Sequence, residues 1–168
     1  FRESQREKMI KTSVRGEDLS RDVQKGRYEE FFIGKLRSAF GSKITDTIEF
    51  TLPNGNAFVP DAAYIDSLTG LCIDIEIDEP YTIPGGMPIH YIGGPDDYRN
   101  SYFSNMGWFV IRLAEEQVAK HYEECIRFIK EFIAQLKFGT VPSFQFPVNQ
   151  WTKADAYTLS ESNYRNNY

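Results

Sequence analysis

The stretch CIDIEIDEPY, residues 72–81, alternates acidic and aliphatic side chains. Asp74, Glu76 and Asp78 are separated by single isoleucines. Successive side chains of a β-strand point to opposite faces, so the pattern predicts a strand with carboxylates on one face and isoleucines on the other. Like charges on one face repel each other. They require either water, as on the exposed face of an antiparallel sheet, or a positive charge such as a metal ion.

The composition indicates one globular α/β domain. The chain has 168 residues, of which 41% are hydrophobic and 15% aromatic, enough for a single core. No apolar run reaches the roughly 18 residues that a membrane span requires, and no signal peptide is visible. Cys72 and Cys125 lie in apolar patterns, which predicts buried, reduced thiols of a cytoplasmic protein. The first residue is Phe1 rather than Met, so we expect a piece of a longer protein.

The charge is unevenly distributed along the chain. The net charge is −5, but residues 1–27 hold eight Lys or Arg against five Asp or Glu, which is about +3. The negative total argues against a protein that coats nucleic acid, whereas the basic N-terminal arm could contact phosphates. A solvated helical face would explain the same mixture of charges.

Hydrophobic periodicity predicts the order of the elements. Helices are expected at residues 1–13, 27–40, 96–106, 114–137 and, behind a capping box of Thr152 and Asp155, near the end of the chain. Strands are expected at residues 47–53, 57–65, 71–78 and 108–113, with a Gly/Pro-rich loop at 80–95.

This order predicts an α/β fold with a mixed central sheet flanked by helices, and with helical N- and C-terminal extensions. The expected divisions are a basic helical arm at residues 1–26, a core at 27–138, and a linker with a C-terminal helix at 139–168.

The turn SLTG places two acids opposite each other. If these four residues form a hairpin loop, Asp66 faces Leu71, and counting back brings Asp61 opposite Glu76. Directly opposed residues have Cβ atoms about 4.5–5.5 Å apart, where two carboxylates repel unless a cation lies between them. The spacing therefore predicts a site for Mg²⁺ or Mn²⁺, with the carbonyl of Ile77 as a third ligand.

A further acid lies on the helix at residues 27–40. At 100° per residue its apolar arc is centred near Phe32 and Leu36 and includes Glu29, whereas Glu30 points away. A carboxylate on a core-facing stripe needs a partner, which could be an arginine or a cation. Together with the opposed pair, Glu29 is a third candidate acid of the metal site.

These acids resemble those of the PD-(D/E)XK nuclease superfamily: an acid on a first helix, the dipeptide PD at residues 60–61, and an acid-x-acid pair on the next strand. The chain is more closely similar to the very short patch repair-like endonuclease branch. There the second strand reads I-E-x-D-G, and the next helix and strand read D-x-x-R-x-x-x-L-x-x-x-G-[YW]-x-V-x-R. The matching residues, with Phe103 at the Leu position, are Asp96, Arg99, Gly107, Trp108, Val110 and Arg112.

The resemblance covers residues 27–137 and implies a restriction endonuclease-like core that hydrolyses phosphodiester bonds of nucleic acid. The expected substrate is DNA rather than RNA. Asp61 and Glu76 would hold the metal ion, and Glu29 would orient a metal-bound water or anchor a second ion. Asp78 stands where the superfamily usually has a lysine, and Asp78 or His90 would accept the proton of the attacking water.

Arg99, Arg112 and Lys35 are the candidate substrate-binding residues, because guanidinium and ammonium groups bind phosphate. Two other functions remain open. One is a nucleic-acid-binding module that has lost catalysis, which the absent lysine favours. The other is a protein-interaction domain of a larger assembly.

Overall fold

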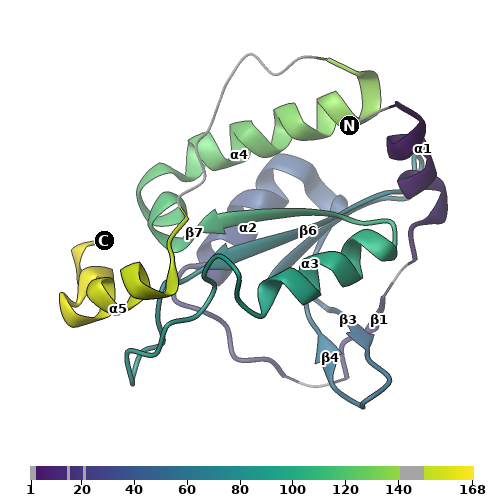
Figure 1. Cartoon of the computed structure of the whole chain (residues 1–168). Coiled ribbons are helices and arrows are strands. Elements are labelled where there is room, and N and C mark those ends of the chain that lie inside the picture. The colour runs from purple at the N-terminus through teal and green to yellow at the C-terminus, as the bar shows by residue number, and fades with distance from the viewer. Residues whose placement is uncertain (1–2, 15, 21, 141–149) are drawn as a thin grey trace.

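The computed structural model describes residues 3–14, 16–20, 22–140 and 150–168. Its central sheet has the strand order β2-β5-β6-β7 (Figure 1). The strands are β2 (Ile44–Thr45), β5 (Ala62–Asp66), β6 (Leu71–Asp78) and β7 (Phe109–Ala114). β5 pairs antiparallel with β2 and with β6, whereas β7 pairs parallel with β6. The expected α/β architecture with a mixed sheet is therefore confirmed.

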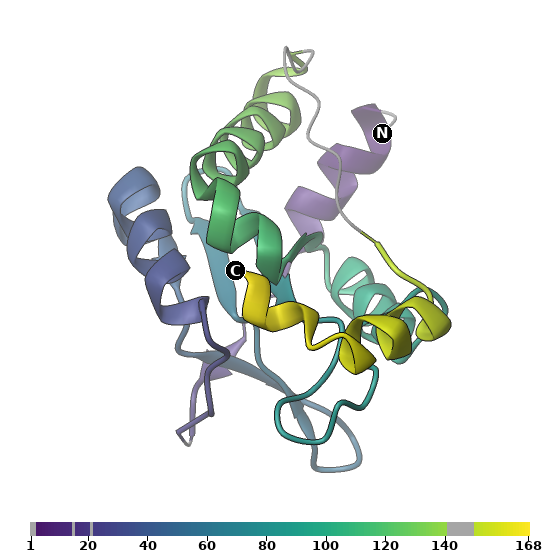
Figure 2. The same ribbon diagram turned by 90° about the vertical axis from the view of Figure 1, so that its left-hand side faces the viewer.

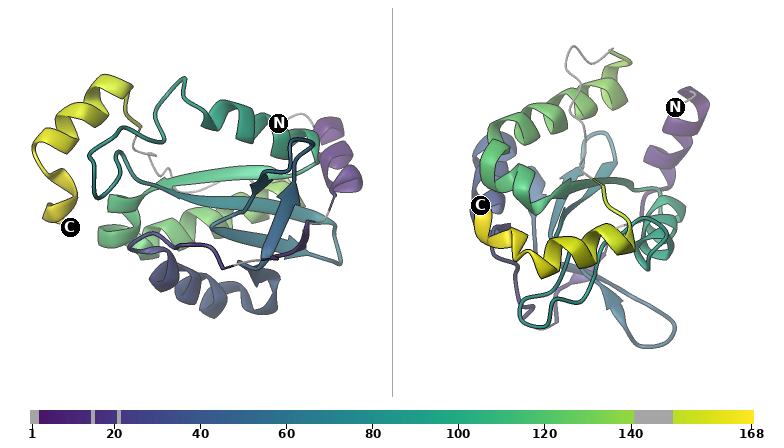
Figure 3. Two further views of the ribbon diagram at one scale, coloured as in Figure 1. Left: turned by 90° about the horizontal axis from the view of Figure 1, so that it is seen from below. Right: turned by 60° about the vertical axis from the view of Figure 1, so that its left-hand side comes forward.

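Helices cover both faces of this sheet (Figure 3). α2 (Glu29–Phe40) and α4 (Glu115–Phe138) lie on one face, and α3 (Asp96–Asn105), which connects β6 to β7, lies on the other. The isoleucine face of β6 packs in the main core with residues of α2 and α4, among them Ile73, Ile75, Ile77, Phe32, Leu36, Val118, Cys125 and Ile129. Both cysteines are buried thiols outside any disulfide, as expected.

A second, small sheet has the order β1-β3-β4. Its strands are β1 (Glu17–Asp18), β3 (Ile48–Thr51) and β4 (Ala57–Phe58). The expected strand at residues 57–65 is thus wrong as one element, because β4 and β5 belong to different sheets. Pro60 lies in the break between them, and proline cannot donate a hydrogen bond to a β-ladder.

The expected hairpin register is confirmed. Asp66 is paired with Leu71, and the ladder continues to the pair of Ala62 and Ile75. One step further, Asp61 is opposite Glu76, although β5 begins only at Ala62, so Asp61 lies just outside the strand.

The two ends of the chain pack at opposite ends of the sheet (Figure 1). α1 (Glu3–Thr12) leads to Val14, whose carbonyl accepts a 2.6 Å hydrogen bond from the Trp108 indole. α5 (Lys153–Glu161) has the expected capping box, and the short helix η2 (Tyr164–Asn167) follows it beside the start of α4 (Figure 2). Most of the expected linker, residues 141–149, lies outside the described residues, as do Arg2, Arg15 and Arg21 of the basic arm. None of the helices in the described ranges is long and apolar enough to span a membrane.

Candidate metal centre

The acidic face of β6 is buried under α3 rather than exposed to water. The residue exposures are 0% for Asp74, 5% for Glu76 and 9% for Asp78. The alternative of an ordinary solvated sheet face is therefore wrong. Buried carboxylates require opposite charges or hydrogen bonds, so the partners of these acids determine what the face can do.

Arg99 of α3 supplies one positive charge to two of the acids. Its Nη1 lies 3.1 Å from Asp74 Oδ2 and forms a shorter ion pair with Glu76. Nη2 donates to the Val59 carbonyl at 3.1 Å, and the guanidinium lies 4.9 Å from the centroid of the Phe103 ring. Arg99 is only 8% exposed. We therefore assign it to neutralising and positioning the acids instead of contacting phosphate.

Arg112 of β7 is the partner of Asp78. Its Nε and Nη2 each donate to one oxygen of that carboxylate at 2.7 Å, a two-bond geometry specific to Arg. Nη1 donates to Asn100 at 3.1 Å, and Nη2 also lies 3.0 Å from Asp96. The guanidinium of Arg112 is thus bound by several protein groups of this cluster.

His90, from the loop after β6, joins this second cluster. Its Nδ1 is 3.1 Å from Asp96 Oδ2 and 3.6 Å from Asp78 Oδ1. Burial by itself would lower the pKa of His90, but the hydrogen bond with Asp96 and the charge of Asp78 outweigh it and raise that pKa. His90 is thus held beside Asp78 within an ion-pair network.

Asp61, Glu76 and Glu29 come together at the edge of the acidic face. The Asp61 N–H donates to Glu76 Oε1 at 3.1 Å, and Asp61 Oδ2 accepts a 2.8 Å hydrogen bond from the Ile77 N–H. Burial raises the pKa of Asp61 well above its ordinary value, and the negative charges of Glu76 and Glu29 raise it further. Burial likewise raises the pKa of Glu29, with a contribution from Glu76.

The start of α2 places Glu29 at this position. Its Oε1 accepts a 2.5 Å hydrogen bond from the Gly26 N–H. A Cβ atom on Gly26 would lie 2.6 Å from Glu79 Oε1 and 2.7 Å from Glu29 Oε1, closer than such contacts allow. A side chain at position 26 would therefore have to displace one of these two carboxylates. Glu30 is exposed, in agreement with the expected helix phase.

The Ile77 carbonyl faces the same edge. The N–H and C=O of one strand residue point to the same side of the strand, and the Ile77 N–H points to Asp61. The register places Pro60 opposite Ile77, and proline has no N–H to donate to this carbonyl. The carbonyl is therefore suited to receive a cation.

The donor oxygens at this edge, two carboxylates and one carbonyl, are of the type that Mg²⁺ binds. The described residues contain no ready-made group of three His, Cys, Asp or Glu side chains that could hold a metal. Mg²⁺, however, is commonly bound by only one or two carboxylates with several waters. Asp74 is fully buried, and its Oδ2 is paired with Arg99 Nη1 at 3.1 Å. The carboxylates of Glu29, Asp61, Asp74 and Glu76 lie close together, and the charge of Glu76 raises the pKa of each of the other three. A bound cation would relieve this repulsion.

Lys35 is not brought to this centre. Its Nζ lies 5.2 Å from the Phe31 ring centroid and 4.7 Å from that of Tyr122, between α2 and α4. Lys35 therefore lies on the face of the sheet that α2 and α4 cover, opposite to the acidic face of β6. The expected substrate contact therefore has no geometric support.

An important pair was missed by sequence reasoning. Arg165 donates to both oxygens of Glu115, at 2.6 and 2.5 Å, and to the Tyr81 carbonyl at 2.8 Å. Glu115 is 1% exposed and Arg165 6%. The two residues are 50 positions apart, so no local pattern joins them. The sequence offered one signal for this pair, which is that Glu115 lies in the first turn of α4, where an acidic side chain is favoured.

Comparisons with protein families, with curated proteins and with solved structures find no match to this chain. The interpretation of the site therefore rests on its residues and their geometry.

Proposed function

We propose that the chain is a metal-dependent endonuclease-like domain of the PD-(D/E)XK type, which hydrolyses phosphodiester bonds of nucleic acid. The proposed substrate is DNA rather than RNA. The observation that carries the proposal is the convergence of Glu29, Asp61 and Glu76. These acids come from a helix, a bend and a strand, and each is held in place by a backbone contact or an ion pair.

Asp61, Glu76 and the Ile77 carbonyl would hold Mg²⁺ or Mn²⁺. Such an ion stabilises negative charge on the phosphate and lowers the pKa of a bound water. Both oxygens of Asp78 are bound to Arg112, which weakens Asp78 as a proton acceptor. Burial raises the pKa of Glu29, which makes this carboxylate a further candidate to take the proton of the attacking water.

A cavity of about 450 Å³ beside Glu29 supports a nucleic-acid substrate. Lys25 and Arg27, from the end of the basic arm, line this cavity. Arg27 is exposed, and the hydrogen bond described for its guanidinium goes to a backbone carbonyl, that of Arg165, at 2.8 Å. We assign phosphate contact to Arg27 in particular, because the Lys25 ammonium forms an ion pair with Asp46.

Nicking of a supercoiled plasmid in Mg²⁺ or Mn²⁺ tests this function. The wild-type chain should nick the plasmid, and Glu76→Gln should abolish nicking and weaken Mn²⁺ binding measured by calorimetry. Glu30→Gln, which removes an exposed carboxylate of the same helix that carries Glu29, is the matched control and should change neither. A wild-type chain that binds neither Mn²⁺ nor DNA would refute the proposal.

A catalytically inactive nucleic-acid-binding module, or an interaction module of a larger assembly, is the second candidate. It is favoured by the ion pair between Arg99 and Glu76 and by Asp78 at the usual lysine position. DNA binding in a gel-shift assay that persists in EDTA, without any nicking, would identify the binding module. Association with a protein partner in the absence of DNA affinity would identify the other.

A further inference from the structure

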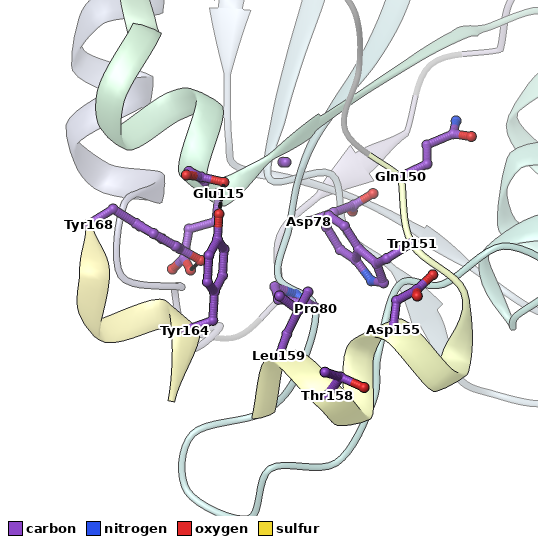
Figure 4. Close-up of a pocket in the computed structure, with 12 residues that line it drawn as sticks. Asp78, Pro80, Glu115, Gln150, Trp151, Asp155, Thr158, Leu159, Tyr164 and Tyr168 are labelled. Carbon is purple, nitrogen blue, oxygen red and sulfur yellow. Dashed lines mark hydrogen bonds between the residues drawn. The ribbon is translucent and has the colours of Figure 1, made fainter. Parts of the chain in front are cut away.

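A separate cavity of about 330 Å³ lies between the start of α4 and the C-terminal segment (Figure 4). Three aromatic side chains line it, those of Trp151, Tyr164 and Tyr168, together with the apolar Pro80 and Leu159. A volume of this size is at the lower end of cavities that bind small molecules.

The charged side chains among the described residues that line this cavity are all acidic. Four carboxylates line the cavity, those of Asp78, Glu115, Glu116 and Asp155. No described lining residue is Lys, Arg or His. An anion is therefore disfavoured in this cavity, because it would meet like charges without a donor cation at the surface.

Three of the carboxylates are balanced by cations outside the lining. Asp78 is bound by Arg112 and Glu115 by Arg165. Glu116 is bound by Lys120 at 2.8 Å.

Asp155 is the carboxylate that remains. Its Oδ2 accepts hydrogen bonds from the Thr152 N–H at 2.8 Å and the Thr152 hydroxyl at 2.7 Å, and no described cation contacts it. The wall consequently carries one negative charge in excess.

We infer that this cavity binds a small monovalent organic cation, a primary alkylammonium with an apolar stem. The rings and Leu159 would cover the stem, and the excess carboxylate of Asp155 would receive the ammonium group. One lining ring already has an ammonium neighbour, since Lys120 Nζ lies 5.7 Å from the centroid of Tyr168. Aromatic faces attract cations at this distance. The inference is independent of the nuclease proposal, because none of Glu29, Asp61 and Glu76 lines this cavity.

Titration with n-butylammonium tests the inference, with n-butanol and butyrate as the uncharged and anionic probes. The Trp151 indole N–H resonance, assigned with Trp151→Phe, reports occupancy at the cavity. We expect n-butylammonium to shift this resonance at concentrations at least tenfold below those that n-butanol requires, and butyrate to leave it unchanged.

Asp155→Asn tests the source of the charge. Asn keeps an oxygen that can accept from Thr152 and so preserves the cap of α5, but it removes the excess charge. It should weaken n-butylammonium binding about tenfold and leave n-butanol binding unchanged. Glu161→Gln, an exposed acid at the other end of α5, is the matched control and should have no effect. Equal binding of the charged and uncharged probes, binding of butyrate, absence of binding, or an unaffected Asp155→Asn variant would overturn the inference.

Discussion

The carboxyl group of Asp61 is buried beside other acids, an environment that disfavours its ionised form. Its carboxylate faces two other acids, and burial together with their charges raises its pKa above the ordinary value of 3.8. The folded state then holds the proton more tightly than the unfolded state. The stability that this proton supplies is complete below the ordinary pKa and is lost as the pH rises through the raised pKa. In the absence of metal, ionisation of Asp61 therefore opposes folding.

Asp61→Asn should therefore stabilise the metal-free chain at pH 8, because it removes a carboxylate whose ionisation is opposed by burial and by the charges of Glu76 and Glu29. Asn retains an oxygen that can accept from the Ile77 N–H. The gain should vanish near pH 4, where the carboxyl is protonated, and Mn²⁺ affinity should be lost. Urea unfolding at both pH values and calorimetric titration measure these effects. Unchanged Mn²⁺ affinity would exclude Asp61 as a ligand.

Glu29 and Glu30 provide a comparison of neighbouring residues on one helix. Glu29→Gln keeps the shape of the side chain but removes a charge that faces Asp61 and Glu76. We expect the variant to fold normally and to lose most plasmid nicking. Glu30→Gln should retain full nicking and change the free energy of unfolding by no more than about 0.5 kcal/mol. Equal effects of the two substitutions would show that Glu29 has no role beyond the helix surface.

At the scale of elements, β6 and α3 depend on each other through Arg99. Local sequence was sufficient to predict both, because an alternating strand and a short helix that Gly107 ends are determined by adjacent residues. It did not reveal that α3 covers the acidic face, since that contact joins Arg99 to acids 25 positions earlier in the chain. A solvated face and a buried ion-pair face have the same alternation.

Arg99→Met should destabilise the chain by roughly 3–5 kcal/mol, because it leaves the buried carboxylates of Asp74 and Glu76 without their cation. The double substitution Arg99→Met with Asp74→Asn should lose less than the two single effects added together. Thermal and urea unfolding measure both. Arg37→Met is the control. It removes an arginine of α2 whose exposed side chain pairs with Asp46, and it should lower the free energy of unfolding by less than about 1 kcal/mol. Similar losses for Arg37→Met and Arg99→Met would contradict the assigned role.

At the scale of the whole molecule, the C-terminal segment is fastened to the core by a few polar contacts. Arg165 joins η2 to Glu115 at the start of α4 and to Tyr81 after β6. Tyr164 and Tyr168 add hydrogen bonds to Glu116 and Glu115, at 2.6 and 3.0 Å. Removing the Arg165 side chain should therefore detach the whole C-terminal segment from the core.

Arg165→Met should lower the free energy of unfolding by roughly 3 kcal/mol, because Glu115 is left buried without a cation. It should also expose the chain after residue 150 to limited proteolysis and abolish the alkylammonium response of Trp151. Arg127→Met, which removes an exposed arginine paired with Glu131 within α4, should change none of these measurements appreciably. A protease-resistant Arg165→Met variant would show that other contacts hold the segment.

The sequence by itself determined the α/β class, the order of the main helices and strands, the hairpin register that brings Asp61 opposite Glu76, and the inward phase of Glu29. These features follow from periodicity, turn length and caps, all of which act over a few residues. The tertiary structure decided which charges meet. It joined Arg99 and Arg112 to the acidic face, moved Lys35 away from it, divided one expected strand between two sheets, and built the aromatic cavity around Asp155. Such contacts depend on how distant elements pack, and side chains many positions apart leave no periodic signal of their pairing.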